Sequence, residues 1–115
     1  MAADSAKRGG GRRSPASMIA SQLRTLARDH ARVQLKRERA WASITFSGTR
    51  YCFSIEWPAA TDALALQELT RILPGHEFDI PGYFVADIVI TDQSEFQLRV
   101  EILSIRDPVE ALPDS

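Results

Sequence analysis

The sequence has one cysteine, Cys52, and two histidines, His30 and His76, among its 115 residues. A lone cysteine cannot form a disulfide within the chain, and no cysteine-based metal cluster can be assembled from it. Small secreted domains commonly depend on disulfides, so the sequence favours a reducing compartment.

Long hydrophobic runs are also absent. The apolar stretches have the length of a strand and end at Asp, Gly or Pro, whereas a membrane-spanning helix needs about 20 apolar residues. Arg24 and Arg28 stand where a secretory signal needs an uncharged apolar segment. The composition, with 44% apolar and 25% charged residues, is typical of one globular domain. We therefore expect a soluble, cytoplasmic protein without membrane contact.

Motifs of known catalytic sites are missing as well. The chain has no G-x-S-x-G nucleophile elbow and no G-x-G-x-x-G, and Gly9-Gly10-Gly11 lacks the Lys-Ser/Thr ending of a phosphate-binding loop. Cys52 has no basic neighbour in sequence that would activate its thiol, so we interpret it as structural. The sequence predicts no catalytic residue and no cofactor. Whether the protein is an enzyme stays open, because active sites can also form between chains.

Metal-ligating residue types gather only at His76, Glu77 and Asp79. A single histidine in such a loop is more often solvated or locally hydrogen-bonded than bound to a metal. His30 falls on the apolar side of a predicted helix, where we expect a ring at the core edge that bonds a backbone carbonyl. The sequence therefore predicts no metal site.

Charge is divided unevenly along the chain. Residues 1–50 contain eleven Lys or Arg and three Asp or Glu, whereas residues 51–115 contain three and twelve. Basic residues on a flexible arm and a helix face can follow a phosphate backbone through unspecific electrostatics, which makes a nucleic-acid-associated protein our alternative hypothesis. The residues concerned are Lys7, Arg8, Arg12, Arg13, Arg24, Arg28 and Arg32. Other interpretations are a solvated helix face with a solubilising tail, attraction between the two halves, and an organellar transit segment over residues 1–37.

The N-terminal third predicts a tail and a helix. Residues 1–13 are small and basic with almost nothing to bury, so we expect a disordered basic tail. Ser14 and Pro15 have the pattern of an N-cap followed by proline in the first turn. One face of the helix collects Ile19, Leu23, Leu26, His30 and Val33. We place the helix end near residues 30–32, although residues 33–36 alternate and could instead open a strand.

Residues 41–57 predict a β-hairpin. Two alternating runs flank Gly48-Thr49, and glycine in the first position suits a two-residue type II′ turn. The apolar residues then pair on one face, as Phe46 with Tyr51, Ile44 with Phe53 and Ala42 with Ile55.

The second half predicts another helix and another hairpin. Thr61 can cap the helix, which Pro74-Gly75 stops. The hairpin runs over residues 83–91 and 96–105 around the turn Asp92-Gln93-Ser94. Its register pairs Ile90 with Phe96, Ile88 with Leu98, Ala86 with Val100, Phe84 with Ile102, and Asp87 with Arg99.

Together these elements predict an α+β fold of order α-β-β-α-β-β. We expect a two-layer sandwich in which two helices pack on one face of an antiparallel sheet made of two hairpins. The domain spans residues 14–106, and residues 107–115 form an acidic C-terminal tail. The sequence leaves the order of the strands open.

The outward face of the second hairpin is more apolar than a solvated sheet face requires. We predict that it carries the contact residues Tyr83, Val85, Val89 and Leu103. The first helix, a second copy of the chain or another protein could cover them. Our leading hypothesis is a non-enzymatic protein-interaction module that associates with itself through a sheet face or edge.

Three segments carry a resemblance. Residues 41–50 (WASITFSGTR), 76–82 (HEFDIPG) and 85–88 (VADI) resemble a family of small uncharacterised bacterial proteins. The resemblance extends over about the middle half of the chain and implies a bacterial cytoplasmic setting and a shared fold. It assigns no catalytic residue to this chain.

Overall fold

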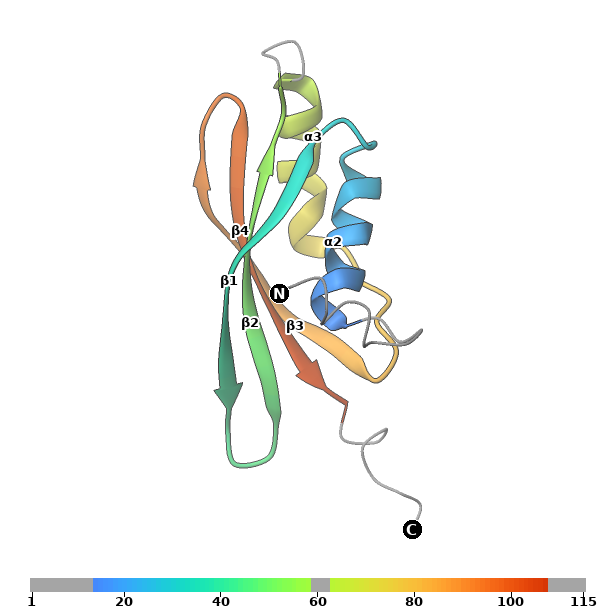
Figure 1. Cartoon of the computed structure of the whole chain (residues 1–115), viewed down its shortest axis with the longest axis vertical. Coiled ribbons are helices and arrows are strands. Elements are labelled where there is room, and N and C mark those ends of the chain that lie inside the picture. Colours follow the sequence, from blue (N-terminus) through green and yellow to red (C-terminus); the bar gives the residue numbers. More distant parts are fainter. Residues whose placement is uncertain (1–13, 59–62, 108–115) are drawn as a thin grey trace, which may run out of the picture.

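The structure is a computed structural model that describes residues 14–58 and 63–107. Its elements are α2 (Pro15–Leu26), β1 (Arg32–Ala42), β2 (Ser47–Glu56), α3 (Ala63–Ile72), the short 3₁₀ helix η2 (Leu73–Gly75), β3 (Tyr83–Gln93) and β4 (Gln97–Arg106) (Figure 1). The predicted α+β class and the order α-β-β-α-β-β are confirmed. The predicted tail residues 1–13 and 108–115 and the predicted cap at Thr61 lie outside the described residues. Asp107 donates its backbone N–H to the Gly82 carbonyl at 2.9 Å.

The four strands form one antiparallel sheet of order β1-β2-β4-β3. The two hairpins meet along β2 and β4, which become the central strands. Figure 1 shows α2 and α3 on the same side of the sheet. The core on that side combines residues of both helices with alternate residues of the central strands: Ile19, Leu23, Leu66, Leu69, Tyr51, Phe53, Ile55, Leu98, Val100 and Ile102. Burying about ten such side chains supplies the main driving force for folding.

The helix α2 begins as predicted. The Ser14 hydroxyl oxygen accepts a hydrogen bond from the Ser17 backbone N–H at 3.1 Å, and Pro15 lies in the first turn. This cap satisfies one of the backbone donors that a helix start leaves unpaired.

The predicted end of this helix near residues 30–32 is wrong. The helix ends at Leu26, and the chain reverses through Arg28 and Asp29, whose φ angles of 62° and 60° lie in the left-handed region. The reversal lets Val33 pack on the core from a strand instead of from the helix. His30 is consequently an exposed turn residue, so its predicted place on the apolar helix face is also wrong.

The first hairpin exists, but its predicted turn and register are wrong. The strands are joined through residues 43–46, where the Phe46 N–H bonds the Ser43 hydroxyl at 3.1 Å and the Ser43 N–H bonds the Phe46 carbonyl at 2.8 Å. Phe53 pairs with Leu35 rather than with Ile44, and Ile44 is fully exposed in the turn. The longer β1 strand is favoured over the predicted short hairpin because it places Val33 and Leu35 opposite the core residues of β2.

Gly48 is a strand residue of β2. It pairs with Trp41 on one side and Ile105 on the other. A Cβ atom at this position would collide with the Ser104 carbonyl oxygen and would lie 2.9 Å from the Ile105 Cα. The glycine therefore permits a close approach of two backbones and does not form a turn.

The second hairpin is also present with a different register. Ile88 pairs with Ile102 and Ile90 with Val100, so the predicted partners are wrong. Two irregularities, between Val85 and Asp87 and between Ile90 and Asp92, shift the pairing along β3. Asp87 consequently lies opposite Leu103 and Asp92 opposite Arg99, which replaces the predicted pair of Asp87 with Arg99.

Candidate protein-interaction surface

The face of the sheet turned away from α2 and α3 is the main surface left without a helix among the described elements (Figure 1). We call it the outer face. Its residues alternate with the core residues along each strand. In β1 they are Arg32, Gln34, Arg37, Arg39 and Trp41, in β2 Gly48, Arg50, Cys52, Ser54 and Glu56, in β4 Gln97, Arg99, Glu101, Leu103 and Ile105, and in β3 Phe84, Asp87, Val89 and Asp92.

The outer face carries an apolar patch that extends from one end towards the middle of β3, and we define it as Phe46, Phe84, Val89, Leu103 and Ile105. Leu103 and Ile105 are only 6% and 5% exposed and form its floor, whereas Phe84 and Val89 are 38% and 41% exposed and form its rim. The Phe46 ring meets the Phe84 ring edge-on, with the centroids 6.2 Å apart. Apolar side chains thus gather on a sheet face that neither α2 nor α3 covers.

Two of the four predicted contact residues lie on this face. Val89 and Leu103 belong to the apolar patch. The predicted placement of Tyr83 and Val85 on the outer face is wrong, because both pack against the core. The extra residue in β3, Ala86, reverses the alternation of side chains at this end of the strand.

Three residues of the patch were not predicted as contacts. The assumed hairpin registers placed Phe46 and Phe84 in the core. Ile105 could have been found, since it stands two residues after Leu103 and therefore on the same face of a strand.

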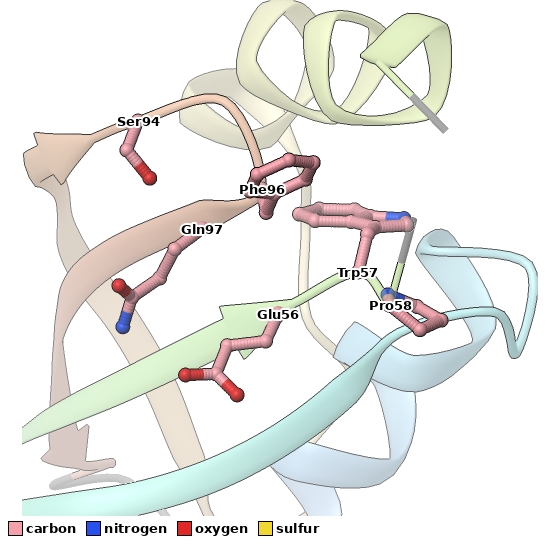
Figure 2. Close-up of a pocket in the computed structure, with 6 residues that line it drawn as sticks. All are labelled: Glu56, Trp57, Pro58, Ser94, Phe96 and Gln97. Atoms are coloured by element: carbon pink, nitrogen blue, oxygen red, sulfur yellow. The ribbon is translucent and has the colours of Figure 1, made fainter. Parts of the chain in front are cut away.

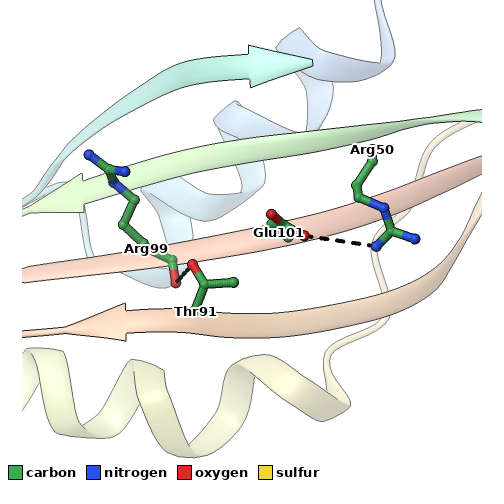
Figure 3. Close-up of polar contacts among 4 residues, drawn as sticks. All are labelled: Arg50, Thr91, Arg99 and Glu101. Atoms are coloured by element: carbon green, nitrogen blue, oxygen red, sulfur yellow. Dashed lines mark hydrogen bonds and ion pairs between the residues drawn. The ribbon is translucent and has the colours of Figure 1, made fainter. Parts of the chain in front are cut away.

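Polar groups occupy the middle of the outer face (Figure 3). Arg50 Nη1 and Glu101 Oε1 are 3.9 Å apart, and such a partly exposed pair contributes at most about 1 kcal/mol. The Thr91 hydroxyl donates to the Arg99 carbonyl at 3.5 Å. Arg99 Nε is buried without a hydrogen-bond partner within residues 14–58 and 63–107. The centre of the face is therefore polar, while its patch end is apolar.

Charge of opposite sign lies along the two sheet edges. The outer-face cations of β1 are Arg32, Arg37 and Arg39, and the outer-face acids of β3 are Asp87 and Asp92. All five are exposed. The outer face is consequently basic at one edge and acidic at the other.

The predicted basic helix face is only partly present. Arg24 lies in α2, Arg28 lies in the turn that follows, and Arg32 is the first residue of β1, so the three do not share one helix. All three are exposed. The arm residues Lys7, Arg8, Arg12 and Arg13 lie outside the described residues.

No protein family, curated protein or solved structure matches this chain. The resemblance of residues 41–50 and 76–82 to small bacterial proteins stays a prediction.

Two shallow pockets flank Trp57 at the end of the sheet remote from the patch. The first has a volume of about 350 Å³ and lies between Glu56–Pro58 and the β3–β4 turn (Figure 2). The second, of about 290 Å³, is formed with residues 29–32. Trp57 donates its backbone N–H to the Phe96 carbonyl at 2.8 Å. In the first pocket Glu56 is the sole titratable side chain among the lining residues, so an acid–base pair is not assembled there.

The loop that contains His76, Glu77 and Asp79 has a structural role. The Gln22 amide of α2 donates to the Asp79 carbonyl at 2.8 Å and accepts from the Asp79 N–H at 3.0 Å. The His76 ring packs edge-on against Phe78, with centroids 4.6 Å apart. The two Gln22 hydrogen bonds attach the loop to α2. Within the described parts of the chain no cluster of three or more His, Cys, Asp or Glu side chains could hold a metal ion.

Burial raises the pKa of the Tyr51 phenol, which lies on the core side of the sheet. A hydrogen bond with Thr49 lowers this pKa, whereas the nearby Glu38 and Tyr83 raise it slightly further.

None of the helices seen in residues 14–58 and 63–107 is long and apolar enough to cross a membrane.

Proposed function

We propose that this protein is a small protein-interaction module that associates with itself through the outer face of its sheet, and that it acts by binding rather than by catalysis. The observation that carries the proposal is the apolar patch. Phe84 and Val89 remain substantially exposed above a floor of Leu103 and Ile105, on a face without helical cover among the described elements. Exposed apolar patches on soluble domains mark interaction sites.

A bacterial cytoplasmic setting belongs to the same proposal. It is supported by the resemblance described above and by Cys52, a free and buried cysteine that suits a reducing compartment.

Sedimentation velocity of the full chain tests the proposal, over concentrations from about 1 to 200 μM. We expect the sedimentation coefficient to rise with concentration. Val89→Asp should weaken the association, because it places a charge in the patch. Leu64→Asp is the matched control, since Leu64 is 78% exposed and lies on α3, away from the outer face. A wild-type chain that stays monomeric over the whole range contradicts the proposal.

A second candidate function is nucleic-acid association. Arg24, Arg28, Arg32, Lys36, Arg37 and Arg39 are all exposed. No acidic side chain lies within 4.0 Å of these six groups in the parts of the chain that the structure describes. Four of the six, Arg32, Lys36, Arg37 and Arg39, lie on the edge strand β1, and exposed cations of this kind could contact phosphates.

Fluorescence anisotropy with labelled DNA and RNA over a salt series tests this candidate. Phosphate contact predicts binding whose logarithm falls linearly with the logarithm of salt concentration. The slope should become shallower in two full-length variants, one with Gln at positions 7, 8, 12 and 13 and one with Arg37→Gln and Arg39→Gln. A flat response at low salt eliminates the candidate.

A further inference from the structure

The outer face is self-complementary. Its edge cations lie on β1 and its edge acids on β3, the two opposite edges of the sheet, while Arg50 and Glu101 between these edges pair with each other. An interface between two copies related by a twofold axis requires one surface that carries both halves of each contact. A surface that binds a different protein needs to carry only one half of each contact.

Cross-strand neighbours define the position of each charge. Reading across the sheet from β1 to β3, one row consists of Arg39, Arg50, Leu103 and Asp87. The neighbouring row consists of Trp41, Gly48, Ile105 and Phe84. Arg39 and Asp87 therefore lie at opposite ends of a row that contains the patch residue Leu103.

Two sheets can be stacked face to face with the twofold axis in either of two main directions. An axis parallel to the strands places β1 of one copy over β3 of the other, so that Arg39 faces Asp87 twice. An axis perpendicular to the strands places β1 over β1, so that Arg37 and Arg39 face the same cations. Like charges held in contact are unfavourable, and the first arrangement avoids them.

The size of the face is sufficient for such a contact. Four strands spaced about 4.8 Å apart, each with ten or eleven residues at about 3.3 Å per residue, present roughly 600 Å² per copy. Two faces together provide about 1,200 Å², which is at the lower end of specific interfaces. Stacked sheets also keep their strands within about 30° of each other, as the parallel axis requires.

Building on the proposed function, we infer that the partner of the outer face is a second copy of this chain, related by a twofold axis parallel to the strands, with Arg39 of each copy facing Asp87 of the other.

Charge exchange tests the inference in the full chain. Sedimentation velocity should show that Arg39→Asp and Asp87→Arg each weaken association about tenfold or more, because each variant turns two attractive contacts into two repulsive ones. The double variant with both substitutions should return to within about threefold of the wild type. Arg24→Asp on α2 is the control for the change in net charge, and thermal unfolding verifies that each variant is folded.

Each outcome has a distinct meaning. Loss in both single variants with recovery in the double variant supports the inference. A dimer that Val89→Asp weakens, but that neither single charge variant affects, overturns the parallel axis and leaves the proposed function intact. A monomeric wild type overturns both.

Discussion

Replacing Gly48 by alanine should destabilise the fold strongly. A Cβ atom on residue 48 would collide with the Ser104 carbonyl oxygen and lie 2.9 Å from the Ile105 Cα. Both neighbours are backbone atoms of β4, so no side-chain rotation can relieve the collision, and β2 must move away from β4. Overpacking of this kind costs about 1–3 kcal/mol, and each ladder hydrogen bond that is weakened adds about 1 kcal/mol. We expect Gly48→Ala to lower the free energy of unfolding by about 3 kcal/mol.

Urea and thermal unfolding, followed by far-ultraviolet circular dichroism, measure the effect. A loss of about 3 kcal/mol corresponds to a decrease in Tm of roughly 12–24 °C for a domain of this size. The matched control is Gly75→Ala in η2, because a Cβ atom there meets nothing within 4 Å. The control should stay within about 0.5 kcal/mol of the wild type. A Gly48→Ala variant as stable as this control would refute the close approach of β2 and β4.

Three other substitutions test the fold. Ile44→Asp should change the free energy of unfolding by less than about 0.5 kcal/mol, because Ile44 is fully exposed in the β1–β2 turn. A loss of several kcal/mol, measured by urea unfolding, would instead indicate the register that pairs Ile44 with Phe53 in the core. Ser104→Ala should stabilise the protein by about 1 kcal/mol, because the Ser104 hydroxyl is buried without a hydrogen-bond partner in the described structure. A clear destabilisation in the same assay would show that the hydroxyl is paired. Tyr51 has a raised pKa in the folded chain, so its contribution to stability is complete below the unfolded value of 10.0 and is lost as the pH rises above it. Between about pH 9 and 11 the wild type should therefore lose more stability than Tyr51→Phe, and equal losses would contradict the burial of this phenol.

The class of the fold and the faces of its central strands could be predicted from the sequence. Tyr51, Phe53 and Ile55 alternate with the smaller residues Cys52 and Ser54 and face the core in either hairpin register, so the pattern alone identifies the inner face of β2. The cap at Ser14 is equally local, because it depends only on the first turn of α2. Such features need no information from distant parts of the chain.

The turn of the first hairpin could not be predicted in the same way. Gly48-Thr49 has suitable turn chemistry, but Gly48 is required by the backbone of β4, which is far away in sequence. The packing of Val33 on the core decides in favour of the longer β1 strand, and this contact also depends on tertiary structure. Local propensity and long-range packing disagree here, and packing prevails.

The candidate surface was predicted in part for a related reason. Val89 and Leu103 follow the simple alternation of a strand, so their place on the outer face could be deduced. Tyr83 and Val85 could not be placed, because the extra residue at Ala86 reverses the alternation and leaves no distinct signal in the sequence. The charge division was visible in the sequence, but its placement on opposite edges depends on the strand order.

The strand order also has a consequence for the kinetics of folding. β1 and β2 form one local hairpin and β3 and β4 form another, and isolated hairpins of this type form within about 1–10 μs. The pairing of β2 with β4 is the one ladder in this sheet that joins strands not consecutive in the chain, with α3 and β3 between them. Closing that long loop costs entropy before the ladder forms, so docking of the two hairpins should set the folding rate.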